Sequence, residues 1–374
     1  MRILHITTFL QGGAGRIIAA LAVAQRHAGH DVTLVTDSGG EPGYGSYPEY
    51  LEQLADTGIA VRALASTFKR DLALNVAAAD ALWALVREAP PDVVHSHAAI
   101  PTLVAALARR RQTWPVVQTM HGWGVHKTPD QARTDIALLA VADARVTPSR
   151  AARDTLTALG LTAAVDVIPY GITPQPVAPA IDARDETLFA GLRTERQAIA
   201  ICIGTLGERK QQTLLVDALV RSRDVTAVFI GEGDVETLRA HAVSRGVERR
   251  VQVLGYRREA SRYLAHADAL VLPSKNEGLP IVVLEALRAG VAVVGAAIPE
   301  IGEALDAETG WLFNAGDAEA LAAALRTALE SAARPARQAA ARALFAARYE
   351  LPRMTEAYAA LYRAQVAGTR PAAG

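Results

Sequence analysis

The sequence predicts an α/β protein with two Rossmann-like, doubly wound domains that face each other across a cleft. Three observations support this fold. The chain has 374 residues, which is more than one hydrophobic core usually covers. Short β-branched runs alternate with Ala- and Leu-rich helical stretches along the whole chain, as they do in βαβ units with parallel sheets. A proline-rich segment from Pro169 to Pro179 interrupts this pattern near its middle and is expected to be a linker.

Apolar, β-branched runs mark the expected strands of each domain. In the first half these runs are 2–7, 31–36, 60–64, 93–96, 115–119, 144–147 and 166–168. In the second half they are 198–204, 225–231, 251–255, 269–272, 292–294 and 310–313. We therefore expect one domain in residues 1–170 and a second in residues 171–350. The remaining stretch, 351–374, begins with helical spacing, and we expect this helix to pack back on the first domain.

Composition argues against several classes of function. Lys plus Arg and Asp plus Glu both total 39, whereas a general nucleic-acid binder normally has a basic excess. The single cysteine, Cys202, lies in an apolar run, so we expect neither a disulfide nor a cysteine-based metal site. No apolar run is long enough to span a membrane, and the N-terminal stretch lacks a secretory cleavage site. We therefore expect a soluble, cytoplasmic protein.

One short segment is a candidate for peripheral contact with the inner face of a membrane. The run 109–114 places three arginines close to Trp114, and such a combination of cations and an aromatic ring is found at membrane surfaces. The alternative is the solvated end of a helix, which is the commoner role of a charge cluster.

Two acidic residues near residue 280 are the most informative feature of the chain. Pro273 ends the expected strand 269–272, and a helix is expected to begin near Pro280, because proline suits the first helical turn. Glu277 would then lie at the carboxyl end of a strand, where open α/β sheets bind ligands. Glu285 would lie in an otherwise apolar helix, so its carboxylate needs a hydrogen-bonding partner.

Two interpretations of these carboxylates are open. In the first, Glu277 and Glu285 accept hydrogen bonds from hydroxyls of a sugar nucleotide, and the backbone between them faces its diphosphate. That backbone segment includes Gly278, Leu279, Pro280 and Ile281. In the second, Glu277 is an exposed loop residue and Glu285 pairs with Arg288 one helical turn on.

A glycine-rich turn follows the first expected strand and precedes a helix. Gly12 and Gly13 would let the backbone approach a phosphate at the helix N-terminus. A dinucleotide site would require Gly-x-Gly-x-x-Gly, but Gly15 is followed three residues later by Ile18. This departure argues against a dehydrogenase.

Histidines follow two further strands of the first domain. His121 could donate a hydrogen bond to a sugar hydroxyl or to an anionic group, or it could bond a backbone carbonyl in a purely structural role. His95 and His97 flank Ser96, and we expect them on opposite faces of their strand. One would pack in the core and the other would line the cleft floor. No Asp or Glu lies beside them in the sequence, so no metal site is expected.

The second domain offers cations and an aromatic ring at the ends of strands. Arg209 and Lys210 follow the strand 198–204 and suit a diphosphate, with Lys210 as a point charge and Arg209 as a planar donor. The alternative is an exposed charged turn balanced by Glu208. Tyr256 follows another strand, where a nucleoside could rest, and its ring could stack there or simply pack.

In this order, the motifs resemble the retaining nucleotide-sugar glycosyltransferases of family 4, which have the GT-B fold. The resemblance spans nearly the whole chain, and the segment from Glu277 to Glu285 is its most specific part. The other matching elements are the Gly12-Gly13 loop, His121-Gly122, 142–149, 167–171, Lys210 and 231–233. The resemblance implies an acceptor domain in residues 1–170 and a nucleotide-sugar donor domain in residues 171–350.

The resemblance also implies a role for each matching residue of the second domain. Glu277 would bind hydroxyls of the donor sugar together with amides near Gly278 and Leu279. Glu285 would hold the ribose hydroxyls, and Lys210 would hold the diphosphate.

In the first domain, the resemblance implies that Gly13 contacts the donor through its backbone and that His121 contacts a donor-sugar hydroxyl. The leaving phosphate would take the proton of the acceptor, so no protein nucleophile is needed. No Asp-x-Asp triplet occurs in the chain, and we expect a metal-independent transferase without a cofactor.

The chain departs from the family pattern beside the expected diphosphate site. Thr205 stands where the family commonly has Gly-Arg, and Lys210 is followed by Gln211 rather than by glycine. Arg209 would have to replace the missing cation. We expect transfer of a sugar, from a UDP-sugar in the first instance, to a glycan, lipid or small-molecule acceptor. The alternatives are a sugar-nucleotide epimerase of the same shape and a non-catalytic sugar-nucleotide-binding protein.

Overall fold

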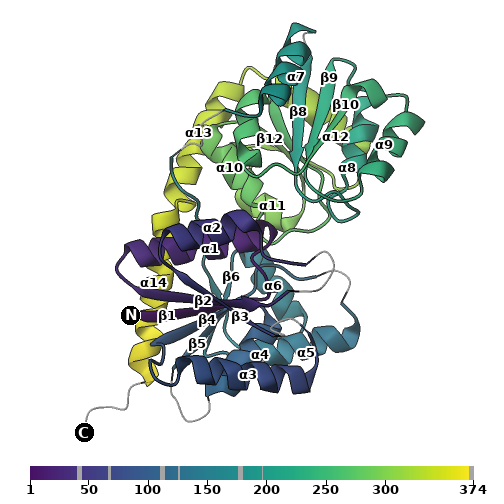
Figure 1. Cartoon of the computed structure of the whole chain (residues 1–374). Coiled ribbons are helices and arrows are strands. Elements are labelled where there is room, and N and C mark those ends of the chain that lie inside the picture. Colours follow the sequence, from purple (N-terminus) through teal and green to yellow (C-terminus); the bar gives the residue numbers. More distant parts are fainter. Residues whose placement is uncertain are drawn as a thin grey trace. The chain divides into compact units, whose positions relative to one another are not determined.

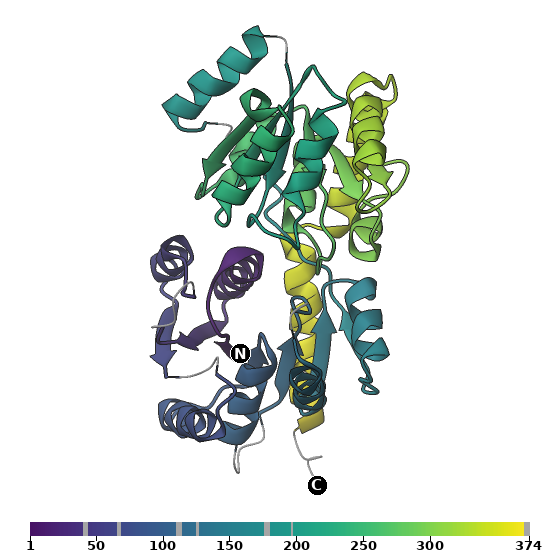
Figure 2. The same ribbon diagram turned by 90° about the vertical axis from the view of Figure 1, so that its right-hand side faces the viewer.

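The computed structural model describes residues 1–39, 44–65, 69–109, 114–124, 127–175, 180–195 and 197–369. The chain divides into two compact units, the first formed by Met1–Ile172 with Glu350–Gly374 and the second by Thr173–Tyr349. Each unit contains one parallel sheet with helices on both faces (Figures 1 and 2). The predicted class, with two Rossmann-like domains, is confirmed. Part of the expected linker, 176–179, lies outside the described residues.

The first unit is built on a seven-stranded sheet with the order β3-β2-β1-β4-β5-β6-β7. Its strands are β1 (Arg2–Ile6), β2 (Asp31–Asp37), β3 (Ala60–Leu64), β4 (Val93–Ser96), β5 (Val116–Thr119), β6 (Ala144–Thr147) and β7 (Asp166–Val167). All described pairs between them are parallel. The chain reverses its direction across the sheet between β1 and β4, and such a reversal is where doubly wound sheets bind ligands.

Helices cover both faces of this sheet. The helices are α1 (Gly12–His27), α2 (Pro48–Asp56), α3 (Leu72–Val86), α4 (Ala99–Arg109), α5 (Pro129–Ala140), α6 (Arg150–Ala158) and α14 (Leu351–Thr369). Figure 1 shows α1, α2 and α14 on one face and α3, α4 and α5 on the other. A core of buried side chains, including Leu82, Val94 and Trp114, fills the space between the sheet and the helices α3 and α4.

The C-terminal helix α14 is part of the first unit. Its two tyrosines, Tyr358 and Tyr362, are buried against the sheet. The chain enters α14 beside Gly171, where an added β-carbon would lie 2.6 Å from the carbonyl oxygen of Glu350. Only glycine permits this close approach of two backbones. Gly171 therefore fixes where the last helix returns to the first sheet.

The second unit is built on a six-stranded parallel sheet with the order β10-β9-β8-β11-β12-β13. Its strands are β8 (Ala198–Ile203), β9 (Val225–Ile230), β10 (Val251–Gly255), β11 (Ala269–Leu272), β12 (Ala292–Ala296) and β13 (Trp311–Phe313). Each of the thirteen expected strands is present, with ends within two residues of the prediction. Every residue of β9 is buried, which is typical of a central strand covered on both faces.

Helices also cover both faces of the second sheet. They are α7 (Ala183–Thr194), α8 (Gln212–Leu219), α9 (Val235–Ser244), α10 (Ile281–Ala289), α11 (Pro299–Ala304), α12 (Ala318–Glu330) and α13 (Arg334–Arg348), with 3-10 turns at Glu248–Arg250 and Ala260–His266. Figure 1 shows α8, α9 and α12 on one face and α10 and α13 on the other. The order β9-β8-β11 again contains a reversal of winding.

Candidate active site

Two loops of the second unit meet at the carboxyl edge of its sheet. One loop follows β8 and carries Arg209 and Lys210, and the other follows β11 and carries Glu277. The loops meet because β8 and β11 are neighbours in the sheet. The amide of Lys275 donates to the carbonyl oxygen of Arg209 at 2.9 Å, and the guanidinium of Arg209 donates to the carbonyl oxygen of Asn276 at 2.9 Å. The two loops are thus joined by hydrogen bonds in both directions.

Glu277 binds both cations of the neighbouring loop. Its side chain lies with one oxygen 2.5 Å from the ammonium nitrogen of Lys210 and the other 3.4 Å from the guanidinium of Arg209. Glu277 is only 8% exposed, so it is not the exposed loop residue of the alternative interpretation. Burial raises the pKa of this carboxyl, but the charges and hydrogen bonds of its neighbours, above all Lys210, bring the pKa below its ordinary value. Glu277 is therefore a carboxylate at neutral pH.

The three side chains together carry a net positive charge of one. Arg209 has a side chain that is 41% exposed, whereas Lys210 is 14% exposed, so the guanidinium remains accessible to solvent. The neighbouring pair Lys275 and Glu208, at 3.0 Å, is neutral and lies at the surface. Arg209 and Lys210 are thus paired with Glu277, and Glu208 of the same turn pairs with Lys275.

Helix α10 begins directly behind this cluster. It starts at Ile281, and Pro280 is its N-cap residue, with no side-chain cap on the helix. The proline thus lies one position before the first helical turn in which it was expected. Glu285 is 3% exposed within α10, and Arg288 donates to the carbonyl oxygen of Thr173 at 2.8 Å. A role of Glu285 towards ribose stays a prediction, as does its pairing with Arg288.

Gln211 stands at the position after Lys210 where the family pattern has glycine. Gln211 has φ 48° and ψ 40°, which is the left-handed conformation that glycine adopts without cost. A β-carbon in this conformation costs on the order of 1 kcal/mol. The residue is also the N-cap of α8, so the strain is located beside the Lys210 and Glu277 pair.

We expect Gln211→Gly to stabilise the second unit by about 1 kcal/mol, because it removes the strained β-carbon. The free energy of unfolding from urea titration measures this change. Gln211→Ala is the matched control, since it shortens the side chain but keeps the β-carbon and should bring no gain. Equal stabilisation by both variants, or none by glycine, would contradict this explanation.

Tyr256 is located two strands away from this cluster. It follows β10 and is 40% exposed, and β9 separates its strand from β8. Its ring is therefore accessible at the same edge of the sheet. Stacking on a nucleoside stays a prediction.

In the first unit, the glycine turn lies at the carboxyl end of β1. Gly12 and Gly13 are exposed at the N-terminus of α1, and the N-cap Gln11 makes no side-chain cap. Gly12 has φ 57°, a conformation that favours glycine. The hydroxyl of Tyr50 donates to the Gly12 carbonyl oxygen at 3.1 Å. Gly12 and Gly13 are thus exposed at the start of a helix, as the sequence predicted, and their contact with a phosphate stays a prediction.

His121 has side-chain partners on both ring nitrogens. Its Nε2 lies 3.0 Å from Nδ1 of His97, and its Nδ1 lies 2.8 Å from the hydroxyl of Tyr170. The ring thus contacts side chains and not the backbone carbonyl of the structural alternative, and its role towards a sugar hydroxyl stays a prediction. Burial lowers the pKa of His121 to about 4, so the ring is neutral at pH 7. A sugar hydroxyl would have to share or replace one of these two contacts.

The expected placement of His95 and His97 was wrong. Side chains two residues apart on a strand point to the same face, and the two rings lie with centroids 4.0 Å apart. Both are buried, at 0% and 6% exposure, so neither lines a cleft floor. They lie between the sheet and the helices α1 and α14. The hydroxyl of Tyr362 contacts His95, and His97 contacts His5, which in turn contacts Gln25.

These partners are the residues that the sequence analysis missed. A signal was present, because His5 interrupts the apolar strand β1 and Gln25 interrupts the apolar face of α1. Buried polar side chains of this kind need hydrogen-bonding partners.

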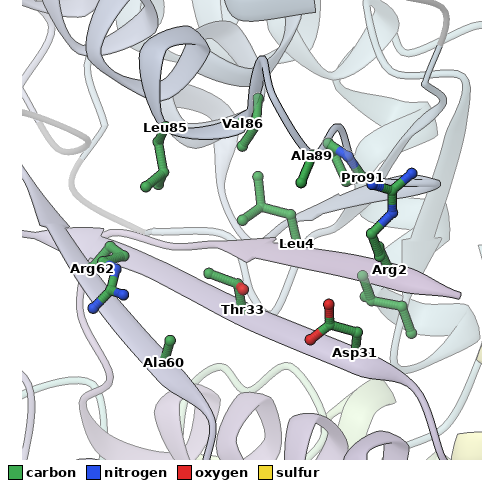
Figure 3. A pocket seen from close by; sticks show the side chains of 11 residues that line it. Arg2, Leu4, Asp31, Thr33, Ala60, Arg62, Leu85, Val86, Ala89 and Pro91 are labelled. Carbon is green, nitrogen blue, oxygen red and sulfur yellow. The ribbon is translucent and has the colours of Figure 1, made fainter.

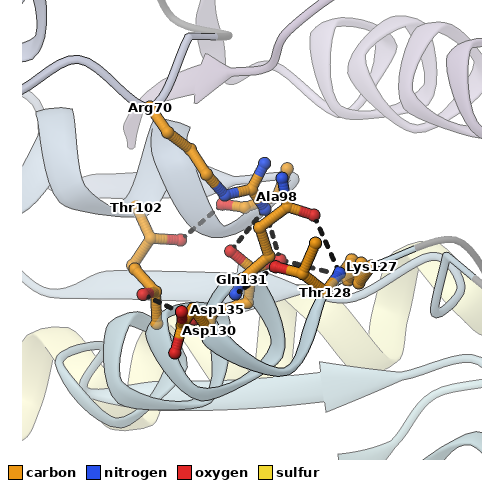
Figure 4. Close-up of polar contacts among 9 residues, drawn as sticks. Arg70, Ala98, Thr102, Lys127, Thr128, Asp130, Gln131 and Asp135 are labelled. Atoms are coloured by element: carbon orange, nitrogen blue, oxygen red, sulfur yellow. Dashed lines mark hydrogen bonds and ion pairs between the residues drawn. The ribbon is translucent and has the colours of Figure 1, made fainter.

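The carboxyl edge of β5 has a further polar cluster, shown in Figure 4. In that cluster, the buried carboxylate of Asp135 binds Arg70 at 2.7 Å and Lys127 at 2.8 Å. The ammonium of Lys127 also lies 3.6 Å from the ring centre of Trp123. Thr128 and Gln131 cap the start of α5 beside it. The cluster therefore fixes the described part of the loop that follows His121.

A small cavity lies at the other edge of the first sheet. It has a volume of about 200 Å³ and is lined by Arg2, Asp31 and Ala60, the first residues of three strands, and by Leu85 of α3 (Figure 3). Ligands of open α/β sheets bind at the carboxyl ends of the strands. This cavity lies at the amino ends, so we do not assign the donor to it.

Both described ends of the candidate membrane segment contact other residues of the first unit. Arg109 binds Asp143 at 2.6 Å, and Trp114 is 5% exposed and stacks on Trp83. The intervening residues 110–113 lie outside the described part of the chain. Among the described helices, none is both long and apolar enough to cross a membrane.

Comparisons with known proteins place the chain in a family. The model for group 1 glycosyl transferases matches residues 183–343, and the model for glycosyltransferase family 4 matches residues 11–175. Glycogen synthase of Mycobacterium tuberculosis is 30% identical, over 96% of this chain and 92% of its own length. The chain belongs to the group 1 and family 4 glycosyltransferases. The predicted family 4 and the predicted glycosyltransferase class are confirmed, whereas retention at the anomeric carbon stays a prediction.

One further relative and two solved structures are also similar to this glycosyltransferase. The sulfoquinovosyl transferase SQD2 of Arabidopsis thaliana is 27% identical over 81% of this chain, which spans 61% of SQD2. Among solved structures, HepE of Anabaena has a TM-score of 0.83 at 20% identity, covering 97% of this chain and all of HepE. Sucrose-phosphate synthase of Thermosynechococcus elongatus has a TM-score of 0.81 at 18% identity, covering 98% of this chain and all of that one. These likenesses confirm the GT-B fold.

Proposed function

We propose that this glycosyltransferase takes its sugar from a nucleoside diphosphate sugar and that the diphosphate binds Lys210 and Arg209. The observation that carries the proposal is the excess positive charge of the Lys210, Arg209 and Glu277 cluster at the carboxyl edge of β8 and β11. Two cations beside one carboxylate can bind a diphosphate and still orient a sugar hydroxyl. Arg209 would supply the cation that Thr205 does not.

We propose UDP as the nucleotide of the donor. HepE, which has the same fold, has been solved with UDP and with UDP-glucose, and this supports the choice. Glu277 would accept hydrogen bonds from the donor sugar, and Glu285 and Tyr256 would lie towards the nucleoside. The exposed residues Gly12 and Gly13 and the N-terminus of α10, which has no side-chain cap, are further candidates for phosphate contacts.

We propose that transfer retains the configuration at the anomeric carbon and needs no metal. The bond from this carbon to the diphosphate oxygen breaks, the acceptor oxygen bonds to the same face, and the departing phosphate takes the acceptor proton. Lys210, Arg209 and the amides of α10 would stabilise the charge of the departing diphosphate. The acceptor is a glycan, a lipid or a small molecule, and any membrane contact is peripheral.

Transfer assays with EDTA test this function. We expect UDP-glucose or another UDP-sugar to give a glycoside whose anomeric configuration, read by proton NMR, matches the donor. Turnover that requires an added divalent cation, or a product of inverted configuration, would contradict the proposed mechanism.

Incubating the sugar nucleotide alone separates the alternatives. An epimerase would convert the donor without an acceptor, whereas a transferase would leave it intact or hydrolyse it slowly. Binding of a sugar nucleotide without any turnover would favour the non-catalytic alternative, which Thr205 motivates.

A further inference from the structure

A single line of hydrogen bonds connects His121 with helix α1. The hydroxyl of Tyr170 contacts Nδ1 of His121 at 2.8 Å, and Nε2 of His121 contacts Nδ1 of His97 at 3.0 Å. Nε2 of His97 contacts Nδ1 of His5 at 2.9 Å, and Nε2 of His5 contacts the amide oxygen of Gln25 at 2.7 Å. We call these five residues the histidine line. They come from β1, α1 and the loops after β4, β5 and β7.

The hydrogen bonds between the rings of the histidine line must all run in the same direction from donor to acceptor. A neutral imidazole has one N–H and one lone pair, and each contact between two rings needs one of each. Burial lowers the pKa of His5 and of His121 to about 4 and that of His97 well below its ordinary value, so all three rings are neutral at pH 7. The tautomer of one ring therefore determines the tautomers of the other two.

Gln25 is the buried, inner end of the line, and its amide determines the direction of the hydrogen bonds. Its amide oxygen lies at His5, and its amide nitrogen donates to the hydroxyl of Tyr362 at 3.3 Å. His5 must then donate from Nε2 and accept at Nδ1. The same order repeats in His97 and in His121, which leaves a lone pair on Nδ1 of His121.

Tyr170 has two acceptors at the outer end. Its hydroxyl can donate to Nδ1 of His121 at 2.8 Å or to the carbonyl oxygen of His121 at 3.2 Å. A ligand hydroxyl that donates to Nδ1 can therefore displace Tyr170 without leaving the tyrosine proton unpaired. The outer end of the line can thus exchange partners, whereas its inner end is buried at Gln25.

We propose that Gln25, His5 and His97 are positioning residues that fix the tautomer of His121, so that Nδ1 accepts a hydrogen bond from a hydroxyl of the donor sugar. The proposal rests on the proposed function and changes the expected role of His121 from donor to acceptor. It assigns a purpose to buried polar residues that do not themselves touch the substrate.

A metal site is the competing use of these histidines. Ligand nitrogens of His5, His95 and His97 lie within 4.8 Å of one another. Both nitrogens of His5 and of His97 are already used in the line, and those of His95 contact Tyr362 and Thr119. A divalent cation would have to break these contacts in a fully buried space, without a carboxylate in the cluster to offset its charge.

Nitrogen-15 NMR of histidine-labelled protein at pH 7.5 tests the proposal without any assay of activity. We expect His5, His97 and His121 to be protonated at Nε2 and unprotonated at Nδ1. Protonation of His121 at Nδ1 would overturn the proposal, and so would a shift of the His5 and His97 ring signals on adding one equivalent of Zn²⁺.

Gln25→Leu tests the consequence for the reaction. Removing the amide oxygen should make His121 a mixture of tautomers and lower kcat/KM for the sugar nucleotide roughly tenfold, which corresponds to about 1.4 kcal/mol. Binding of UDP without a sugar should not change. The matched control is Thr119→Val, which removes a buried hydroxyl from the neighbouring His95 contact and leaves the line intact.

Different results would contradict the proposed function and the positioning role of Gln25, His5 and His97. If no sugar nucleotide binds the wild-type protein, the proposed function fails while the NMR result still decides the tautomers. If Gln25→Leu and Thr119→Val lower kcat/KM equally, or if Gln25→Leu weakens UDP binding as strongly, the positioning role is wrong. If Gln25→Leu does not fold, the wild-type NMR spectrum still supports or overturns the line.

Discussion

Glu277→Gln is expected to lower sugar transfer by about 100-fold, which corresponds to about 2.7 kcal/mol. The change keeps the shape of the side chain but removes the charge that holds Lys210 and Arg209. Hydrogen bonds to a charged group contribute about 1.5–3 kcal/mol each, so the loss of one such contact accounts for this size. Initial rates with the sugar nucleotide and the acceptor measure the effect.

Glu208→Gln is the matched control for this variant. Glu208 lies in the loop of Lys210 and pairs with Lys275 at the surface, and exposed pairs contribute little. We expect rates close to those of the wild type. Circular dichroism and urea unfolding verify that Glu277→Gln is folded. A folded Glu277→Gln protein with wild-type turnover would contradict the role assigned to Glu277.

The first unit is expected to lose about 5 kcal/mol of unfolding free energy between pH 7.5 and 5.5. Burial lowers the pKa of His5, His95, His97 and His121, helped at His95 and His97 by their neighbouring histidines. In the unfolded chain these rings take up protons near pH 6.5, whereas in the folded unit they do not do so until lower pH. Each ring therefore favours the unfolded state by roughly 1 kcal/mol or somewhat more over this range, and the four together account for the expected loss.

The unfolding free energy of the first unit is thus highest above pH 6.5 and decreases as the pH falls towards the lowered pKa values of the buried histidines. Urea unfolding followed by tryptophan fluorescence measures this loss. Trp311→Phe leaves the remaining tryptophans, at 83, 114 and 123, in the first unit, so the signal reports that unit alone. His27→Gln removes an exposed histidine and should leave the pH dependence unchanged. A stability that stays constant from pH 7.5 to 5.5 would contradict the buried, neutral histidines.

Local patterns predicted the sheets because the strands are short and apolar, and glycine or proline ends several of them. Pro273 after β11 and Gly204 after β8 stop their strands where the sequence indicates. The same alternation of strands and helices placed Lys210 and Glu277 at the carboxyl ends of two strands. Strand order then brought those two loops together.

The sequence could not predict contacts that depend on distant partners. Gln25 and Tyr362 are 337 residues apart in the chain, and no local pattern connects them. The placement of His95 and His97 failed for a different reason, since the two-residue period of a strand puts them on one face. The left-handed conformation of Gln211 was equally hidden, because a residue other than glycine rarely adopts a positive φ.

The central claim is that Lys210, Arg209 and Glu277 form the diphosphate site of a nucleotide-sugar donor. Isothermal titration calorimetry in EDTA, with UDP, GDP, ADP and their glucose derivatives, tests it most directly. We expect one nucleotide to bind the wild-type protein and to bind Lys210→Met at least about tenfold more weakly, as the loss of a charged hydrogen bond predicts. Lys275→Met, which removes a surface cation from the adjoining loop, should bind like the wild type. No binding by any nucleotide, or equal binding by wild type and Lys210→Met, would contradict the claim.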